Sequence, residues 1–320
     1  MDILFLTSTR IGDAVLSTGL LSYLAERYRN ARITIAVGPA AAPLFEAVPG
    51  LRRILVVDKQ PYGLHWLGLW AKTVVRRWDL VVDLRGSALS YLLWTGERRI
   101  SGKGDIGEHR VRELGRLFGL EPPPAPHLWL ADRHEKAAAA LIPSGGPVLA
   151  IGPAANWRGK QWRAERFAEL AQILTAPEGI LPGARIAVMA AAHERTQAEP
   201  LLAALPKSRL IDLVGGSDLL TVAAALKRMA LFVGNDTGLT HIAAAVGVPT
   251  LGLFGPSHPT RFAPWGERTA FVQTAIPYDA LVGTPGYDHR TTGTLMDSLT
   301  VDAVEAAVRD LWRRAGATPA

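Results

Sequence analysis

Residues 231–266, LFVGNDTGLTHIAAAVGVPTLGLFGPSHPTRFAPWG, constrain the fold more than any other stretch of this sequence. Two apolar runs, Leu231–Val233 and Thr250–Phe254, predict buried strands. Between them lie a polar turn over Gly234–Gly238 and a small-residue helix over Leu239–Val246. A strand–turn–helix–strand unit of this length predicts a right-handed crossover between two parallel strands.

The polar turn carries the side chains best placed to bind a ligand. Parallel sheets of this kind bind ligands beyond the carboxyl ends of their strands. Asp236, Thr237, Gly238 and His241 lie at that turn and at the start of the helix. Because free backbone N–H groups and the helix dipole favour an anion there, we expect a phosphate-bearing ligand.

The rest of the chain repeats the alternation of strands and helices, which predicts an α/β protein with two doubly wound parallel sheets. Gly and Pro are dense at Glu121–Pro126 and again at Pro143–Pro147. We place the domain boundary at Pro143–Pro147, which gives domains 1–146 and 147–320. The expected strands are Ile3–Leu6, Ile33–Val37, Ile54–Val57, Leu80–Asp83, Val148–Ile151, Arg185–Ala190 and Arg209–Asp212, besides the two above. A terminal amphipathic helix is expected over Thr300–Arg314.

Composition narrows the class of protein. The chain has 320 residues, no cysteine and a formal net charge of +6. Residues 1–146 carry 19 basic and 14 acidic side chains, whereas residues 147–320 carry 16 and 15. The basic excess in the first half fits an anionic partner there, and an arginine-rich genome explains it equally well. No apolar run approaches the about 20 residues of a membrane span. The N-terminal residues lack signal-peptide features, so we expect a cytoplasmic protein.

Several common catalytic motifs are absent from the sequence. The eight histidines show no metal-ligand spacing such as HExxH, and neither a P-loop nor a G-x-S-x-G elbow occurs. Gly102–Gly107 matches the dinucleotide fingerprint literally, but it follows charged residues rather than a clear buried strand. We therefore interpret it as a basic loop, and we expect no metal and no cofactor.

Asp13 lies directly after the first strand, at the start of the first helix. Its position favours a helix N-cap, which stabilises by about 0.5–2 kcal/mol. The same position opens onto the edge of the sheet where a carboxylate can act as a general base.

Lys160 and Glu194 each follow a strand of the second half. Lys160 lies between two tryptophans just before a helix; it is either a solvated surface charge or a cation that neutralises a phosphate. Glu194 is equally compatible with a ribose contact and with a carboxylate stabilised by a helix dipole.

Tyr62–Trp78 mixes aromatic residues, leucines and arginines at partly helical spacing. Such a segment can rest on a membrane surface. We favour a core-facing helix with an arginine-rich outer edge, the more common arrangement.

Taken together, these motifs resemble glycosyltransferase family 9, the ADP-heptose:lipopolysaccharide heptosyltransferases. The resemblance rests on R-I-G-D-A-V-L-S-T-G-L-L near the N-terminus, D-L-V-V-D-L-R-G-S at Asp79–Ser87 and K-Q-W at Lys160–Trp162. It also rests on G-N-D-T-G-L-T-H-I-A-A-A-V-G-V-P-T and on the terminal L-M-D-S-L-T-V-D-A-V, so it covers nearly the whole chain. It implies a GT-B architecture, with two Rossmann-like domains facing each other across a cleft, and inverting transfer without a metal.

The resemblance also implies roles for individual residues. Asp13 would deprotonate the acceptor hydroxyl, with Arg10 and Gly12 as candidates on the acceptor side. Lys160 would hold the donor diphosphate and Glu194 its ribose. Asp236 would hold sugar hydroxyls, with Thr237, Gly238 and His241 completing the donor site.

The expected partners follow from the same resemblance. They are a nucleotide sugar, ADP-heptose in the first instance, and an anionic lipid-linked saccharide of the lipopolysaccharide core, with peripheral contact at the inner face of the cytoplasmic membrane. A different donor sugar or acceptor on the same fold is the alternative. A non-catalytic anion-binding protein is a third hypothesis, but the sequence lacks the aromatic–basic pattern of a nucleic-acid module, so we expect no nucleic acid.

Overall fold

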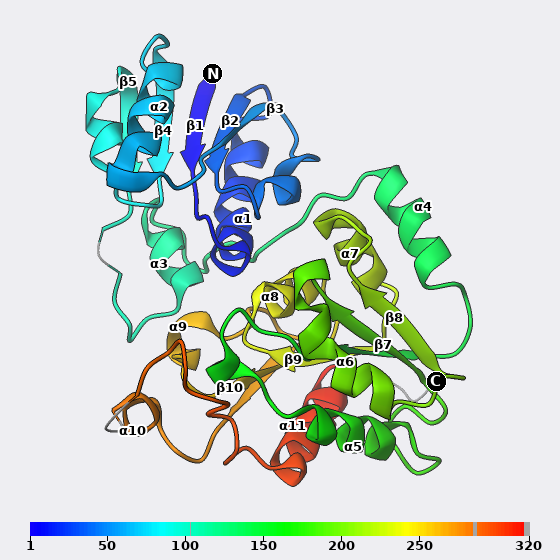
Figure 1. The fold of residues 1–320 in the computed structure, drawn as a ribbon. Helices are drawn as coiled ribbons and strands as arrows, with labels where there is room; N and C mark the ends of the chain where they lie inside the picture. Colours follow the sequence, from blue (N-terminus) through cyan, green and yellow to red (C-terminus); the bar gives the residue numbers. More distant parts are fainter. Residues whose placement is uncertain (103, 284–286, 317–320) are drawn as a thin grey trace. The chain divides into compact units, whose positions relative to one another are not determined.

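The computed structural model describes residues 1–102, 104–283 and 287–316. The chain divides into an N-terminal unit, Met1–Ala131, and a C-terminal unit, Asp132–Ala320 (Figure 1). Each unit contains a parallel sheet with helices packed on it, so the predicted α/β class with two doubly wound domains is confirmed.

The division between the units lies earlier than the predicted boundary between residues 146 and 147. Helix α4 (Asp132–Leu141) accounts for the difference, because it packs against α7 (Leu219–Leu226) of the C-terminal unit. Beyond α7, Lys227 Nζ lies 2.8 Å from Glu135 Oε1 of α4. The proline-rich stretch Glu121–Pro126 therefore lies closer to the boundary than Pro143–Pro147 does.

The N-terminal unit is built on a five-stranded sheet in the order β3-β2-β1-β4-β5, and every neighbouring pair is parallel. Its strands are β1 (Asp2–Leu6), β2 (Arg32–Val37), β3 (Leu51–Val56), β4 (Trp78–Asp83) and β5 (Thr95–Ile100). The four predicted strands correspond to β1–β4. We did not predict β5, because its sequence TGERRI is charged and mostly exposed, as an edge strand can be.

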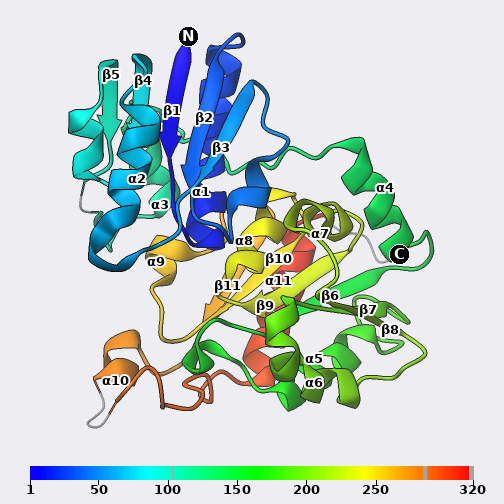
Figure 2. The ribbon, with the colours of Figure 1, turned by 45° about the horizontal axis from the view of Figure 1, so that its top comes forward.

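Helices cover both faces of this sheet, with α1 and α2 on opposite faces (Figure 2). The elements are α1 (Ile11–Arg27), η1 (Ala42–Phe45), η2 (Pro61–Gly63), α2 (Leu64–Thr73), η3 (Ala88–Leu92) and α3 (Arg110–Arg116). The turn after β4 is fixed by the buried carboxylate of Asp83. It accepts hydrogen bonds from the backbone N–H groups of Arg85 and Ser87 and from Ser90 Oγ, at 2.9, 2.9 and 2.6 Å. This satisfies a charge that would be costly to bury unpaired.

The C-terminal unit has a six-stranded parallel sheet in the order β11-β10-β9-β6-β7-β8. Its strands are β6 (Val148–Gly152), β7 (Arg185–Ala190), β8 (Leu210–Val214), β9 (Leu231–Asn235), β10 (Thr250–Phe254) and β11 (Thr269–Gln273). Only β11 was not predicted; it is a partly exposed edge strand beside β10. The remaining elements are η4 (Arg158–Lys160), α5 (Ala164–Thr175), η5 (Ala192–Glu194), α6 (Arg195–Ala204), α8 (Gly238–Ala245), α9 (Pro259–Phe262), α10 (Tyr278–Val282) and α11 (Val301–Arg314).

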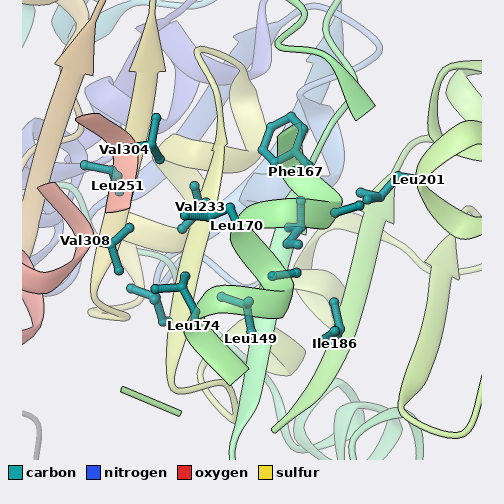
Figure 3. Packing of buried hydrophobic residues seen from close by; sticks show 14 of the residues in the cluster. Leu149, Phe167, Leu170, Leu174, Ile186, Leu201, Val233, Leu251, Val304 and Val308 are labelled. Carbon is teal, nitrogen blue, oxygen red and sulfur yellow. The ribbon is translucent and has the colours of Figure 1, made fainter. Parts of the chain in front are cut away.

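A large hydrophobic core cluster of this unit lies between the sheet and the helices α5 and α11 (Figure 3). Phe167, Leu170 and Leu174 of α5 face inward at helical spacing and are fully or almost fully buried. Val304 and Val308 of α11 do the same from the end of the chain. The predicted terminal amphipathic helix is thus present. No helix in the part of the chain that the structure describes is long and apolar enough to cross a membrane.

Asp218 is the N-cap of α7, and its carboxylate accepts hydrogen bonds from Leu220 N, Thr221 N and Thr221 Oγ1 at 2.7–3.0 Å. Burial by itself raises the pKa of Asp218, but the hydrogen bonds from Thr221 outweigh it and the pKa is lowered. We expect Asp218→Ala to reduce the free energy of unfolding by about 1 kcal/mol, measured by urea denaturation.

A lowered pKa in the folded state means that this contribution is present at neutral pH and is lost as the pH falls below about 4. The difference between wild type and Asp218→Ala should therefore shrink in acid. Asp302→Ala, in the exposed first turn of α11, is the matched control. An equal loss in both variants, independent of pH, would contradict the capping role.

Candidate active site

The order of the C-terminal sheet reverses between β6 and β9. From β6 the chain proceeds outward through β7 and β8, whereas β9, β10 and β11 extend on the other side. In open parallel sheets this switch point opens a crevice beyond the carboxyl ends of the strands, where ligands bind. The loop after β6 and the turn after β9 meet at this point.

Asn235, the last residue of β9, joins the two segments. Its side chain is fully buried; Nδ2 donates to the carbonyl of Pro153 at 2.7 Å, and Oδ1 accepts from the backbone N–H of Trp162 at 3.1 Å. Both ends of the loop that carries Lys160 are therefore tied to the end of β9.

This arrangement brings Lys160 and Asp236 into contact. Lys160 Nζ donates to Asp236 Oδ2 at 2.5 Å, and the exposed fractions of the two side chains are 21% and 7%. Hydrogen bonds between charged groups are shorter and stronger than neutral ones. His241 lies near the second oxygen of the carboxylate, with Nε2 3.9 Å from Asp236 Oδ1. The site thus combines a cation, a carboxylate and an imidazole.

Helix α8 begins beside the ion pair. Thr237 is its N-cap and makes no side-chain capping bond, and Gly238 is its first residue. Thr240 Oγ1 donates to the carbonyl of Asn235 at 2.7 Å, which fixes the first turn against β9. The N–H groups at such a helix start, together with its dipole, attract an anion.

Glu194 lies at the end of β7, and the contact that the structure gives it is local. Its Oε2 accepts from the backbone N–H of Ala191 at 2.9 Å, which caps the short helix η5. The helix-start interpretation of Glu194 therefore describes its contact in this structure, and the ribose contact stays a prediction.

Asp13 belongs to the N-terminal unit, where it is the third residue of α1. We favoured an N-cap here, and that expectation is wrong, because Arg10 occupies the cap position and no side chain caps the helix. The Asp13 carboxylate instead lies 3.4 Å from Ser8 Oγ and is only partly buried. Gly12 lies beside it in the first helical turn. The acid is compatible with the positive end of the helix dipole and stays reachable from solvent.

Comparison with known proteins decides the family. The sequence model of glycosyltransferase family 9 (heptosyltransferase) matches residues 75–281. The chain belongs to glycosyltransferase family 9. It is therefore an enzyme, and the hypothesis of a non-catalytic anion-binding protein is rejected. The matched segment contains Lys160, Glu194 and Asp236, whereas Asp13 precedes it.

Individual members of the family agree with this assignment. The chain is similar to lipooligosaccharide heptosyltransferase 2 of Haemophilus influenzae, with 23% identity over 85% of this chain and 88% of that protein. Its fold is similar to a family 9 glycosyltransferase of Veillonella parvula, with 20% identity, coverage of 97% and 96%, and a TM-score of 0.77. It is also similar to E. coli ADP-heptose LPS heptosyltransferase II, with 19% identity, coverage of 99% and 100%, and a TM-score of 0.74. These folds confirm the predicted GT-B class.

Sequence reasoning missed two features at this edge of the sheet. Gln197 Oε1 accepts from the backbone N–H of Ala155 at 3.1 Å and from Gln161 Nε2 at 2.6 Å. Ser257 follows β10 at the same sheet edge, and its buried Oγ has no hydrogen-bond partner within the described part of the chain. Its position just after the strand Thr250–Phe254 was a signal that could have identified it.

The segment before α11 also contacts this loop. Leu295 N donates to the carbonyl of Gly159 at 3.0 Å, and Arg163 Nε lies 2.5 Å from Asp297 Oδ1. The hydrogen bond and charge of Arg163 lower the pKa of Asp297. Among the described residues, no group of three His, Asp or Glu side chains is arranged to hold a metal ion.

Proposed function

We propose that this enzyme transfers a heptose from ADP-heptose to a saccharide acceptor of the lipopolysaccharide core, with inversion at the anomeric carbon and without a metal ion. The observation that carries the proposal is the contact between Lys160 and Asp236 beside the start of α8, at the switch point of the sheet. It supplies positive charge for a diphosphate and a carboxylate for a sugar within one site. The names of the relatives support the same donor and acceptor classes.

The diphosphate would bind to Lys160 and to the N–H groups at the start of α8. A leaving diphosphate gains negative charge as the glycosidic bond breaks, and fixed positive groups aimed at that charge lower the barrier. Thr237 and Gly238 belong to this half of the site because they form the turn from which the helix starts.

The heptose would bind through Asp236, whose carboxylate accepts hydrogen bonds from sugar hydroxyls. His241 lies beside the same carboxylate and completes this part of the site. In Glu194, Oε2 is engaged with Ala191 N, so Oε1 is the atom proposed to accept from a ribose hydroxyl.

Transfer would proceed as one displacement. The acceptor oxygen forms a bond to the anomeric carbon on the face opposite the diphosphate, the bond from that carbon to the diphosphate oxygen breaks, and the acceptor proton passes to Asp13. A single displacement inverts the anomeric centre. Arg10 and Gly12 border Asp13 and are proposed to contact the acceptor. An acceptor attached to lipid would bring the reaction to the inner face of the cytoplasmic membrane.

The donor is tested by calorimetric titration with ADP-, UDP- and GDP-sugars. We expect ADP-heptose to bind at least about tenfold more tightly than UDP- or GDP-sugars. A ligand that lacks a group to which the site hydrogen-bonds leaves buried polar groups unpaired, and this lowers its affinity by that factor or more. A preference for UDP- or GDP-sugars would show that the donor is not ADP-heptose, while the assignment to family 9 would stand.

The mechanism is tested separately. Transfer that persists at full rate in EDTA, and an inverted anomer in the product NMR spectrum, would support the proposed mechanism. Loss of activity in EDTA or a retained anomer would contradict it.

A further inference from the structure

Helix α2 presents apolar side chains on both its faces. Its inner face packs on the sheet, with Leu69 and Thr73 buried and Trp66 and Trp70 partly buried. The predicted core-facing helix is present, but the predicted arginine-rich outer edge is not, because α2 ends at Thr73 and the two arginines come after it. The exposed residues recur at helical spacing and include a single charge; they are Leu64, Leu67, Gly68, Ala71 and Lys72. A surface helix of a soluble protein usually carries polar residues on that face.

The neighbouring helix η3 continues this apolar surface. It contacts α2 and turns Leu89 and Leu93 toward the same core cluster. Tyr91 and Leu92 point outward and are 69% and 66% exposed, and Trp94 just beyond them is 70% exposed. We define the α2–η3 surface by its exposed apolar residues, which are Tyr62, Leu64, Leu67, Val75, Tyr91, Leu92 and Trp94.

Exposed apolar residues are concentrated on this surface rather than scattered over the molecule. Twelve large hydrophobic side chains are more than a third exposed in the described chain, and eight of them lie between residues 56 and 94. Of these twelve described side chains, only Phe271 and Ile276 belong to the C-terminal unit. A local cluster of this kind marks an interaction site, whereas single exposed apolar residues do not.

The charged side chains within the two segments that form the α2–η3 surface are all basic. Residues 59–78 and 84–96 contain no Asp or Glu. Their basic residues are Lys59, Lys72, Arg76, Arg77 and Arg85. The guanidinium of Arg77 lies 5.9 Å from the ring centre of Trp94, which places a cation beside an exposed aromatic ring. Arg76 is paired with Asp2 at 3.0 Å, and exposed Asp58, Asp79 and Glu97 flank the two segments, so the attraction for anionic lipid is confined to the segments themselves.

We propose that the α2–η3 surface docks this enzyme on an anionic lipid bilayer. Aromatic and leucine side chains enter the boundary between head groups and acyl chains, and basic residues beside them attract anionic lipid. A second copy of the chain is a poorer occupant, because a symmetric interface would place this basic surface against the same basic surface of the other copy.

Docking by this surface has a consequence for the proposed acceptor. Tyr62 and Arg85 follow β3 and β4 just as Asp13 follows β1, and the strands are parallel, so all three lie toward the same edge of the sheet. The bilayer would then lie beside the edge that carries Asp13. The inference goes beyond the proposed reaction, since binding to vesicles needs neither donor nor acceptor and can succeed or fail independently.

The test is co-sedimentation of the purified enzyme with vesicles of phosphatidylcholine, with and without phosphatidylglycerol. We expect binding to the anionic vesicles to be at least about tenfold stronger and to weaken with salt. The variant Leu67→Gln/Leu92→Gln/Trp94→Gln should lose at least about tenfold in vesicle affinity. Lys72→Gln/Arg77→Gln should lose the preference for anionic lipid.

The matched control is Phe271→Gln/Ile276→Gln, which removes exposed apolar residues from the C-terminal unit and should bind vesicles like wild type. Circular dichroism and the melting temperature establish that each variant is folded, and a soluble acceptor establishes that transfer is retained. Absence of vesicle binding by wild type, or equal losses in the surface and control variants, would overturn the proposal. So would a dimer in sedimentation velocity that only the surface variant dissociates.

Discussion

Replacement of Asp13 by asparagine is expected to lower kcat by about 10²–10⁴-fold, the range for removal of a general base. Asparagine has nearly the same shape as aspartate but cannot take the acceptor proton. Donor binding should change little, because the groups proposed to hold the donor all belong to the C-terminal unit. Initial rates of ADP release measure the first effect, and calorimetric titration with ADP-heptose measures the second.

The control for this variant is Glu26→Gln, which removes a carboxylate from the last turns of the same helix. Its side chain accepts a hydrogen bond from Ser22 at 3.0 Å and lies far along α1 from the first turn. It should retain wild-type rates. Loss of the acid from the first turn costs about 0.3–1 kcal/mol of helix stability, so both variants are checked by thermal unfolding. Wild-type kcat in Asp13→Asn would remove Asp13 from the base role.

The fold was predictable wherever strands were buried on both faces. Val148–Ile151 and Thr250–Phe254 read as continuous apolar runs, because parallel strands covered by helices on both sides have no polar face. The edge strands β5 and β11 lack this signal. Arg98 and Arg99 of β5 are exposed, and no pattern in the sequence distinguishes such a strand from a loop.

The contact between Lys160 and Asp236 follows from topology. Both residues come after strands of one parallel sheet, so their loops had to meet at one edge even though the strands are far apart in sequence. The bonds that fix the loop could not be predicted in the same way. Asn235 and Gln197 bond to backbone groups whose positions depend on the packed loop, and the sequence contains no spacing that specifies them.

The outer face of α2 illustrates a different limit. Periodicity identifies a helix by contrast between an apolar and a polar face. In LHWLGLWAKT that contrast is weak, because both faces are apolar. The sequence indicated that one face of the helix meets the core but not which one. In the structure the two faces are distinguished because Leu69 is buried and Leu67 is exposed.

Replacement of Lys160 by alanine is expected to weaken ADP binding by about ten- to a hundredfold, the value of a hydrogen bond to a charged group. It should also lower kcat by about 10²–10³-fold if the ammonium stabilises the departing diphosphate. Arg158→Ala is the matched control, since it removes an exposed positive charge from the same short helix. It should leave both quantities near wild type.

Loss of Lys160 has a second effect that must be separated from the first. Asp236 is 7% exposed and loses its 2.5 Å partner, so its uncompensated charge would repel a diphosphate even if Lys160 never contacted one. The double variant Lys160→Ala/Asp236→Asn removes that repulsion. Because ADP lacks the heptose, the proposed contact between Asp236 and the heptose hydroxyls does not affect this comparison.

The two explanations predict opposite results for the double variant. If Lys160 binds the diphosphate directly, ADP affinity stays low in Lys160→Ala/Asp236→Asn, and Asp236→Asn alone binds ADP at least as well as wild type. Restoration of wild-type affinity in the double variant would mean that Lys160 serves only to neutralise Asp236. Because the two residues are in contact, their effects are not expected to add, and the coupling free energy from the four ADP titrations measures how strongly the pair acts as one unit.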